Sequence, residues 1–244
     1  MEEVVPSDLI NSLTARSFNL LVDESENRPL LNSPDLDPDG NYFNSLTYDS
    51  KYCTPHSLSQ DLSPLPSSLS VMHINCRSLL PKLSEIKDLL HLLPATILAL
   101  TETWLEENQS DLVNIPGYQF IQKPRGASKG GGGVGILIKE GVPHEAQANP
   151  LTSFISFEGL FIDITLKTGN TTVGAMYRPP GQKLDEFTGE IDSHITEILK
   201  KSKELLLIGD MNVDLLKMGE HKATAEFYNC ITAHHLLPLI SNKG

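Results

Sequence analysis

Residues 204–215 read ELLLIGDMNVDL, a short apolar run that ends in acidic and amide side chains. Residues 204–209 have the length and composition of a strand that is buried on both faces of a sheet, and they deliver Asp210 and Asn212 at the strand's end. A second run of this kind, TILALT at residues 96–101, delivers Glu102. Two buried strands that each end in a carboxylate predict a sheet with a polar site at one edge.

The rest of the chain alternates short strands with longer amphipathic segments. Further strands are predicted at 69–75 and 134–139, at 157–166 and 171–177 as a hairpin around Thr168-Gly169-Asn170, and from 238 to 240. Helices are predicted at 82–93, 183–200 and 222–235, where apolar residues recur at helical spacing. This order of βα units and a hairpin predicts an α/β domain with a mixed sheet and helices outside it.

The first 68 residues differ from the remainder in composition. Residues 1–70 hold 13 Ser, 7 Pro, 11 Asp+Glu and 3 Lys+Arg, so their net charge of −8 is most of the chain's −12. Such a segment buries too little apolar surface to offset its ordering entropy. We therefore expect a disordered acidic leader at 1–68 and a folded domain at 69–244.

Charge and cysteine content exclude several classes of protein. The folded part is mildly acidic, which excludes a strongly basic nucleic-acid binder held by bulk charge. Cys53, Cys76 and Cys230 are widely spaced and odd in number, so we expect reduced thiols and no disulfide framework or structural zinc site. The acidic N-terminus is unlike a signal peptide, and no apolar run has the length of a membrane span. We expect an intracellular monomer without membrane contact.

The candidate site residues follow from their positions at strand ends. Asn75 ends strand 69–75, Glu102 follows 96–101, Tyr177 ends 171–177, and Asp210 and Asn212 follow 204–209. Each alone has an ordinary explanation, such as a solvated loop residue or an Asx turn. Together they supply carboxylate, amide and phenol oxygens, which suit Mg²⁺ with phosphate oxygens completing its shell.

Other conspicuous residues are given structural interpretations. Gly130–Gly133 lacks the residues of a P-loop or a dinucleotide fingerprint, and a turn that allows close backbone approach is favoured over a phosphate cradle. Lys123, Arg125 and Lys129 form the most basic stretch and are candidates for backbone contact with a nucleic acid. His73 shares a strand face with Asn75, and the adjacent His234 and His235 point in different directions on a helix, which argues against a metal that they share.

Five motifs together resemble the endonuclease domain of LINE-type (non-LTR) retrotransposons. They are HINCRSL at 73–79, LTETWL at 100–105, GGGVGILIK at 131–139, YRPPG at 177–181 and LLIGDMNVDL at 206–215. That domain belongs to the endonuclease/exonuclease/phosphatase superfamily, which includes DNase I. The resemblance covers residues 69–244. It implies a four-layer α/β sandwich, with two mixed β-sheets packed face to face and helices outside, and Mg²⁺-dependent nicking of DNA, with Mn²⁺ as a possible substitute.

The resemblance also implies a role for each matching residue. Glu102 would be a metal ligand with Asn75 beside the metal, and Tyr177 would contact the scissile phosphate. Asp210 would orient and activate the attacking water. Asn212 would hold Asp210 and the phosphate. The chemistry of these side chains agrees with such roles, because a metal stabilises charge on the leaving oxygen and a carboxylate serves as base.

One departure from the family pattern leaves alternatives open. Family members end with a Ser-Asp-His-type motif on one of the last strands, whereas this chain stops at Ser241-Asn242-Lys243-Gly244. We therefore expect that the last strands of the domain are missing. The first hypothesis is a DNA endonuclease that would act in the nucleus. The alternatives are an inactive remnant or interaction module, which would be cytoplasmic, and another phosphoesterase of the superfamily.

Overall fold

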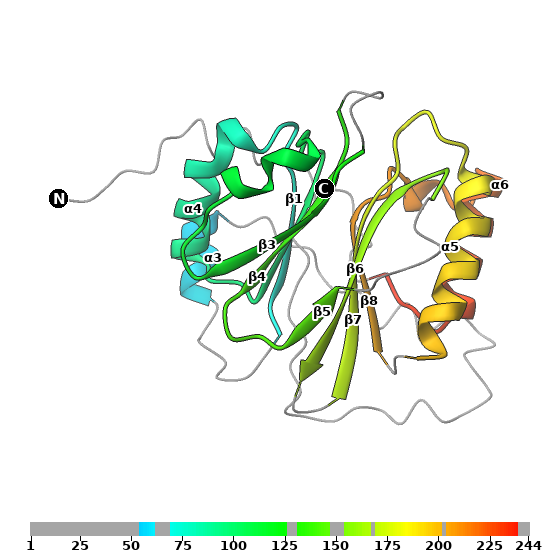
Figure 1. Cartoon of the computed structure of the whole chain (residues 1–244). Helices are drawn as coiled ribbons and strands as arrows, with labels where there is room; N and C mark the ends of the chain where they lie inside the picture. The colour runs from blue at the N-terminus through cyan, green and yellow to red at the C-terminus, as the bar shows by residue number, and fades with distance from the viewer. Residues whose placement is uncertain are drawn as a thin grey trace.

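The structure is a computed structural model that describes residues 54–61, 69–125, 131–146, 154–166, 169–201 and 204–238. Figure 1 shows two β-sheets facing each other, with α3 and α4 outside one sheet and α5 and α6 outside the other. The helices are α3 (Pro55–Asp61), α4 (Leu83–Leu92), α5 (Leu184–Leu199) and α6 (Lys222–Ala233), with 3₁₀ turns η1 (Leu80–Lys82), η2 (Glu107–Leu112) and η3 (Leu215–Lys217).

The first sheet has the strand order β1-β2-β4-β3. Its strands are β1 (Val71–Asn75), β2 (Ile97–Thr101), β3 (Tyr118–Lys123) and β4 (Val134–Lys139). Strands β1 and β2 are parallel, with Asn75 opposite Thr101, whereas β4 is antiparallel to both β2 and β3. The parallel pair places the end of β1 beside the end of β2.

The second sheet has the order β5-β6-β7-β8. Its strands are β5 (His144–Ala146), β6 (Glu158–Leu166), β7 (Gly169–Tyr177) and β8 (Glu204–Asp210). The β6–β7 hairpin is antiparallel, and β7 and β8 are parallel with Tyr177 opposite Asp210. Both sheets are therefore mixed, as expected, and each has one parallel pair whose carboxyl ends lie together.

Three layers of apolar side chains hold the four layers of backbone together. Side chains alternate between the faces of a strand, so in β2 Leu98 and Leu100 pack towards α4 while Ile97 and Ala99 pack between the sheets. The second sheet repeats this division. Ile162 and Val173 join the layer between the sheets. The outer layer against α5 and α6 is made by Phe157, Phe161, Met176, Phe187, Ile191, Ile195, Ile198 and Phe227. The predicted four-layer α/β sandwich is confirmed.

The positions of the predicted elements agree with the structure to within a few residues, with three exceptions. Edge strand β3 and the short β5 were not predicted from the sequence, because half-buried edge strands lack a long apolar run. Helix α3 lies inside the segment predicted to be disordered, so for residues 55–61 the expectation is corrected to a short helix. It forms because Leu58 packs against the apolar cluster that includes α4. The prediction that strand 204–209 is buried on both faces is wrong, because β8 is mostly half-buried at the edge of its sheet.

Some predictions fall on residues that the structure does not describe. Residues 1–53 and 62–68 of the expected leader lie outside the described residues, as do Gly130, Lys129 and residues 239–240 of the last predicted strand. None of the helices in the described ranges is both long and apolar enough to cross a bilayer.

Candidate active site

A single amide group joins the two sheets at their carboxyl edges. The Nδ2 amide of Asn75, the last residue of β1, donates to Glu102 Oε1 over 2.8 Å and to Asp210 Oδ2 over 2.8 Å. Glu102 directly follows β2 in the first sheet, whereas Asp210 ends β8 in the second. Each of the two carboxylate oxygens lies 2.8 Å from the same nitrogen, so the two carboxylates are close together. Three residues chosen from sequence order meet at one point.

The backbone around Glu102 is held in an uncommon conformation. Glu102 and Trp104 have φ values of 53° and 54°, in the left-handed region that side chains other than glycine rarely adopt. Asn212, and Arg77 two residues after Asn75, share this feature, with φ values of 50° and 43°. Such conformations persist where the surrounding structure enforces them, and they gather at functional sites. Their concentration beside Asn75 and Asp210 supports the assignment of this edge as the site.

Backbone hydrogen bonds clamp the Glu102 segment from both sides. The Ser78 N–H donates to the Glu102 carbonyl over 2.9 Å, and the Trp104 N–H donates to the Gly132 carbonyl over 2.8 Å. The glycine segment approaches closely enough that a Cβ on Gly133 would lie 2.6 Å from Thr103 Oγ1. Gly133 also has φ +85°, which favours glycine. The close-approach interpretation of the glycine run thus holds for the residues described, Gly131 to Gly133.

Tyr177 lies at the end of β7 with its ring buried. Burial is the largest cause that raises the pKa of the Tyr177 hydroxyl to about 12, followed by the charge of Glu102 and a hydrogen bond to it, while Arg125 acts in the opposite direction. The Arg125 guanidinium lies 5.5 Å from the centre of the Tyr177 ring. The hydroxyl therefore stays protonated at neutral pH and can donate a hydrogen bond at the site.

Two residues of the basic stretch, Lys123 and Arg125, face inward. Arg125 forms an ion pair with Glu158, whose other oxygen accepts from the Gly133 N–H. The Lys123 ammonium donates to the Gly159 carbonyl over 3.2 Å and lies 4.9 Å from the centre of the Phe154 ring. Lys123 and Arg125 therefore stabilise the glycine loop and β6. Because their charged groups contact the protein itself, these contacts do not favour a role in binding a nucleic-acid backbone.

Asp210 and Asn212 form a compact turn after β8. The Asn212 N–H donates to Asp210 Oδ1 over 3.2 Å, and the Asn212 side-chain amide donates to the Arg178 carbonyl over 2.7 Å. The two Asp210 oxygens thus have different partners, since Oδ2 accepts from Asn75. These two contacts hold the carboxylate in one orientation. Each oxygen keeps a further lone pair that can accept a hydrogen bond from water or a substrate.

Arg178 holds this turn in place, although the sequence analysis gave it no role. Its side chain is 6% exposed and donates to three carbonyls: from Nε to Met211, and from the two terminal nitrogens to Asn212 and Gln182. These carbonyls belong to the loops that follow β7 and β8. The sequence signals were the position of Arg178 directly after a strand end and its place in the YRPPG motif. Its burial could not be predicted, because it depends on a loop more than thirty residues away.

His73 lies below the site on β1, as its shared face with Asn75 predicted. It is buried, and its Nε2 lies 3.0 Å from Thr101 Oγ1. Burial lowers the pKa of His73 to about 4, and the charge of Asp210 opposes this shift. His73 is therefore a neutral support at physiological pH. His234 and His235 lie beyond the end of α6 and are not part of this site.

The oxygens at this edge suit a hard divalent cation. Among the described residues, the buried Asn75 Oδ1 has no hydrogen-bond partner, and an oxygen left in this way beside two carboxylates is a ready ligand. Glu102 and Asp210 supply the negative charge that a cation needs. The donor set therefore fits Mg²⁺ or Mn²⁺, and Glu102 and Asn75 are the residues that would hold the ion.

Comparison with known proteins assigns the sequence that carries this site to a family. Residues 72–224 match the Endonuclease/Exonuclease/phosphatase family. The chain belongs to this family. The match spans all five strand-end residues named above, from Asn75 to Asn212. No curated protein matches the sequence.

Solved structures agree with the fold expected of an Endonuclease/Exonuclease/phosphatase domain. The endonuclease domain of TRAS1, a telomere-specific non-LTR retrotransposon, is 13% identical with a TM-score of 0.51, over 67% of this chain and 69% of that one. The AP endonuclease LMAP from Leishmania major is 12% identical with a TM-score of 0.56, over 95% of this chain and 78% of that one. At such identities the likeness is one of fold, so the chemistry must be argued from the site itself.

Proposed function

We propose that this domain hydrolyses phosphodiester bonds in DNA and nicks one strand in a Mg²⁺-dependent reaction, with Mn²⁺ as a substitute. The observation that carries the proposal is the Asn75 amide, which holds Glu102 and Asp210 together across the two sheets. Structural ion pairs join opposite charges, whereas here two carboxylates of the same charge are kept close. A divalent cation placed beside them would be attracted by both charges.

The cation would be held by Glu102 together with the Asn75 amide oxygen. When bound, it supplies a positive charge that polarises a phosphoryl oxygen and stabilises the charge that develops on the leaving oxygen. Hydrogen bonds from Ser78 to Glu102 and from Trp104 to Gly132 fix the backbone that carries this carboxylate, and the Asn75 amide orients the carboxylate itself. The Glu102 carboxylate is therefore pre-organised to bind a metal ion before substrate binds.

Asp210 is the proposed base. One of its oxygens is held by Asn75 and the other by the Asn212 N–H, so the carboxylate presents fixed lone pairs to an attacking water. A carboxylate in hydrogen-bond reach of water contributes about 10²- to 10⁴-fold in rate. The second N–H of the Asn212 amide is proposed to hold the scissile phosphate. The protonated Tyr177 hydroxyl, which is hydrogen-bonded to Glu102, is proposed to turn to the phosphate when substrate binds.

The surroundings of Glu102 favour a nucleic acid over a small phosphoester. Trp104, two residues after Glu102, is 50% exposed although tryptophan is usually buried. Exposed aromatic rings beside a phosphate site suit stacking on a base, which is worth about 1–3 kcal/mol per base. Trp104 also belongs to the LTETWL motif that supports a function of the non-LTR retrotransposon type, in which a nick in chromosomal DNA, made in the nucleus, primes reverse transcription.

Nicking of supercoiled plasmid tests this proposal. The chain is expected to relax plasmid with Mg²⁺ or Mn²⁺ and not with excess chelator. Glu102→Gln and Asp210→Asn should each slow nicking by at least about 100-fold because each removes one required charge. Glu140→Gln, at an exposed position outside the site, is the matched control and should nick at the wild-type rate.

Two results would contradict the proposal. The first is nicking that persists at the wild-type rate in folded Glu102→Gln or Asp210→Asn protein. The second is a folded wild-type chain that leaves plasmid intact at saturating metal. Cleavage of RNA or nucleotides in the same assay, with plasmid untouched, would point to another phosphoesterase activity of the family.

A further inference from the structure

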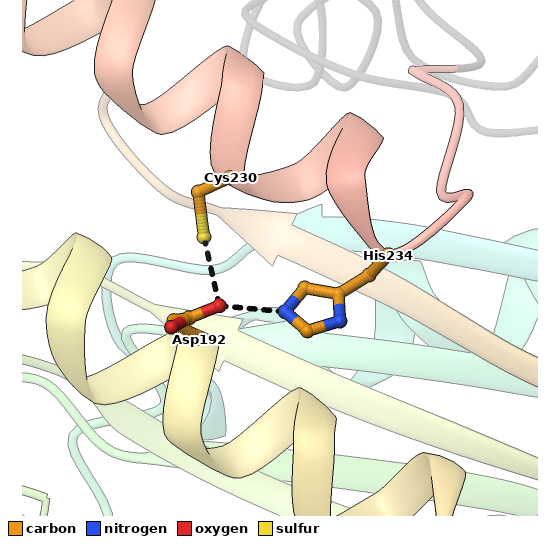
Figure 2. A group of neighbouring side chains, drawn as sticks. All are labelled: Asp192, Cys230 and His234. Carbon is orange, nitrogen blue, oxygen red and sulfur yellow. Dashed lines mark hydrogen bonds and ion pairs between the residues drawn. The ribbon is translucent and has the colours of Figure 1, made fainter.

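A second cluster of metal-binding side chains lies on the opposite side of the second sheet from the sheet interface. Asp192 on α5 faces Cys230 on α6 and His234 directly after it (Figure 2). His234 Nε2 lies 2.6 Å from Asp192 Oδ1, and Cys230 Sγ lies 3.6 Å from the same oxygen. The three ligand atoms all lie within 4.8 Å of one another.

The sequence places two of these ligands on one side of α6. Cys230 and His234 are four residues apart, so they lie one turn apart on the same helix face. His235 is exposed and has a φ of 59°, so it departs from the helix and does not join the cluster. The adjacent histidines therefore do point apart, as expected, but His234 meets a carboxylate and a thiol from which it is distant in sequence.

The two helices that carry the ligands are fixed to each other by packing. Phe187 on α5 and Phe227 on α6 stack with ring centres 5.5 Å apart. Ile191 and Ile195, on either side of Asp192 in the sequence, are fully buried beneath α5. Ligands on rigid elements lose little further freedom when an ion binds, and this pre-organisation raises affinity.

We propose that Asp192, Cys230 and His234 form a zinc site that joins α6 to α5 and keeps its fourth position for water or an external ligand. Thiolate, imidazole and carboxylate are the three side-chain ligands that Zn²⁺ takes. The thiol and imidazole disfavour Mg²⁺, which prefers oxygen ligands. The cluster is thus chemically distinct from the Glu102 site.

Two of the three ligand separations can be compared directly with those that tetrahedral zinc requires, and the third, between Cys230 Sγ and His234 Nε2, is within 4.8 Å. With Zn–S about 2.3 Å and Zn–N and Zn–O about 2.1 Å, ligand atoms lie about 3.3 to 3.6 Å apart. The Cys230–Asp192 separation of 3.6 Å already matches. The His234–Asp192 separation of 2.6 Å has to open by less than an ångström, and the Asp192 side chain is 56% exposed and has room to turn.

The cluster is also held ready by its own hydrogen bonds. The Cys230 Sγ lies within hydrogen-bond reach of Asp192 Oδ1 and, at 3.9 Å, of the Thr188 carbonyl, and its single hydrogen can go to either acceptor. Zinc binding releases the thiol proton, and the ion then lies between the sulfur and the carboxylate.

Cobalt substitution tests the proposal with the metal alone as the probe. The full chain is stripped with chelator and titrated with Co²⁺. We expect one equivalent to give the visible bands of tetrahedral cobalt and a sulfur-to-cobalt charge-transfer band in the near ultraviolet, both removed by one equivalent of Zn²⁺. Zinc should also raise the thermal midpoint of the chain, because it binds the folded state.

Variants identify the ligands and separate this site from the active site. Cys230→Ser should abolish the charge-transfer band, and His234→Gln and Asp192→Asn should each weaken Zn²⁺ binding by at least about 100-fold, beyond the effect of losing an outer hydrogen bond. His235→Gln is the matched control. Asp192→Asn changes an exposed side chain, so it should fold even if the other two variants do not.

Three results would overturn the proposal: no charge-transfer band at stoichiometric cobalt, a band that survives in Cys230→Ser protein, or zinc affinity that is unchanged in folded Asp192→Asn protein. A band that is lost in Cys53→Ser protein instead would assign the thiolate to another part of the chain. Because Glu102→Gln should leave cobalt binding intact, failure of the nuclease proposal and failure of the zinc proposal give different results.

Discussion

Replacing Arg178 with methionine should loosen the turn that carries Asp210 and Asn212. The guanidinium donates to the carbonyls of Met211, Asn212 and Gln182, and the side chain is 6% exposed. Methionine fills much of the same space but donates nothing. The change therefore leaves three backbone carbonyls without their charged donor.

The magnitude follows from the burial of those carbonyls. A buried acceptor left unsatisfied costs about 1–3 kcal/mol. The residues that carry these three acceptors are only half-buried, so water can reach them in part and the lower end applies to each. The free energy of unfolding should fall by about 3 kcal/mol, a large part of the roughly 5–15 kcal/mol that stabilises a typical domain.

Urea unfolding followed by circular dichroism measures the stability term. Arg178→Lys should fall between wild type and Arg178→Met, because a lysine keeps the charge but cannot donate in three fixed directions. Arg77→Met, at an exposed arginine near the site, is the control and should change stability by no more than about 0.5 kcal/mol. Nicking per folded molecule should also fall about tenfold or more in Arg178→Met protein, since the Asp210 turn loses its support. Wild-type stability and wild-type nicking in this variant would show that Arg178 does not hold the Asp210 turn in place.

Three further outcomes are expected. His73 has a pKa of about 4 in the folded chain against an ordinary 6.5, so only the unfolded chain takes up this proton as the pH falls from 6.5 to 4. The free energy of unfolding of the wild type should therefore fall by about 3 kcal/mol over that window relative to His73→Gln, as measured by urea unfolding at each pH. Gly209→Ala should destabilise the domain by about 3 kcal/mol or more, because its Cβ would lie 1.8 Å from the Met176 carbonyl oxygen at φ +149°, whereas Gly189→Ala, with open space on helix α5, should raise the stability by about 0.5–1 kcal/mol in the same melts. Trp104→Ala should raise the KM for DNA about tenfold with kcat nearly unchanged if the exposed ring stacks on a base, and an unchanged KM would remove it from the DNA contact.

The sequence predicted the layers of the fold because the physical signal was local. In β2, the alternation of Ile97 and Ala99 with Leu98 and Leu100 places apolar side chains on both faces, which is how a strand buried between two layers must read. Strand β3 gave no such signal, since its residues are only partly buried at a sheet edge. Helix α3 was missed because its formation depends on the contact of Leu58 with a cluster far along the chain.

The proximity of the candidate residues could be predicted from the sequence, whereas their hydrogen bonds could not. Asn75, Glu102 and Asp210 each stand at a strand end, and parallel strands bring such ends together. That one amide joins both carboxylates could not be read from the sequence, because it depends on how the two sheets face each other. Arg178, and the grouping of Asp192 with His234, were missed for the same reason, since each depends on a contact between segments distant in the chain.

The proposed activity requires that the edge joined by Asn75 binds one hard cation, and this binding can be measured directly. Mn²⁺ titrated into the full chain and followed by electron paramagnetic resonance should show one bound ion that Mg²⁺ displaces. Glu102→Gln should weaken this binding by at least about 100-fold, and Glu140→Gln should not change it. If folded Glu102→Gln protein binds Mn²⁺ as tightly as wild type, the two carboxylates do not form a cation site and the account is wrong.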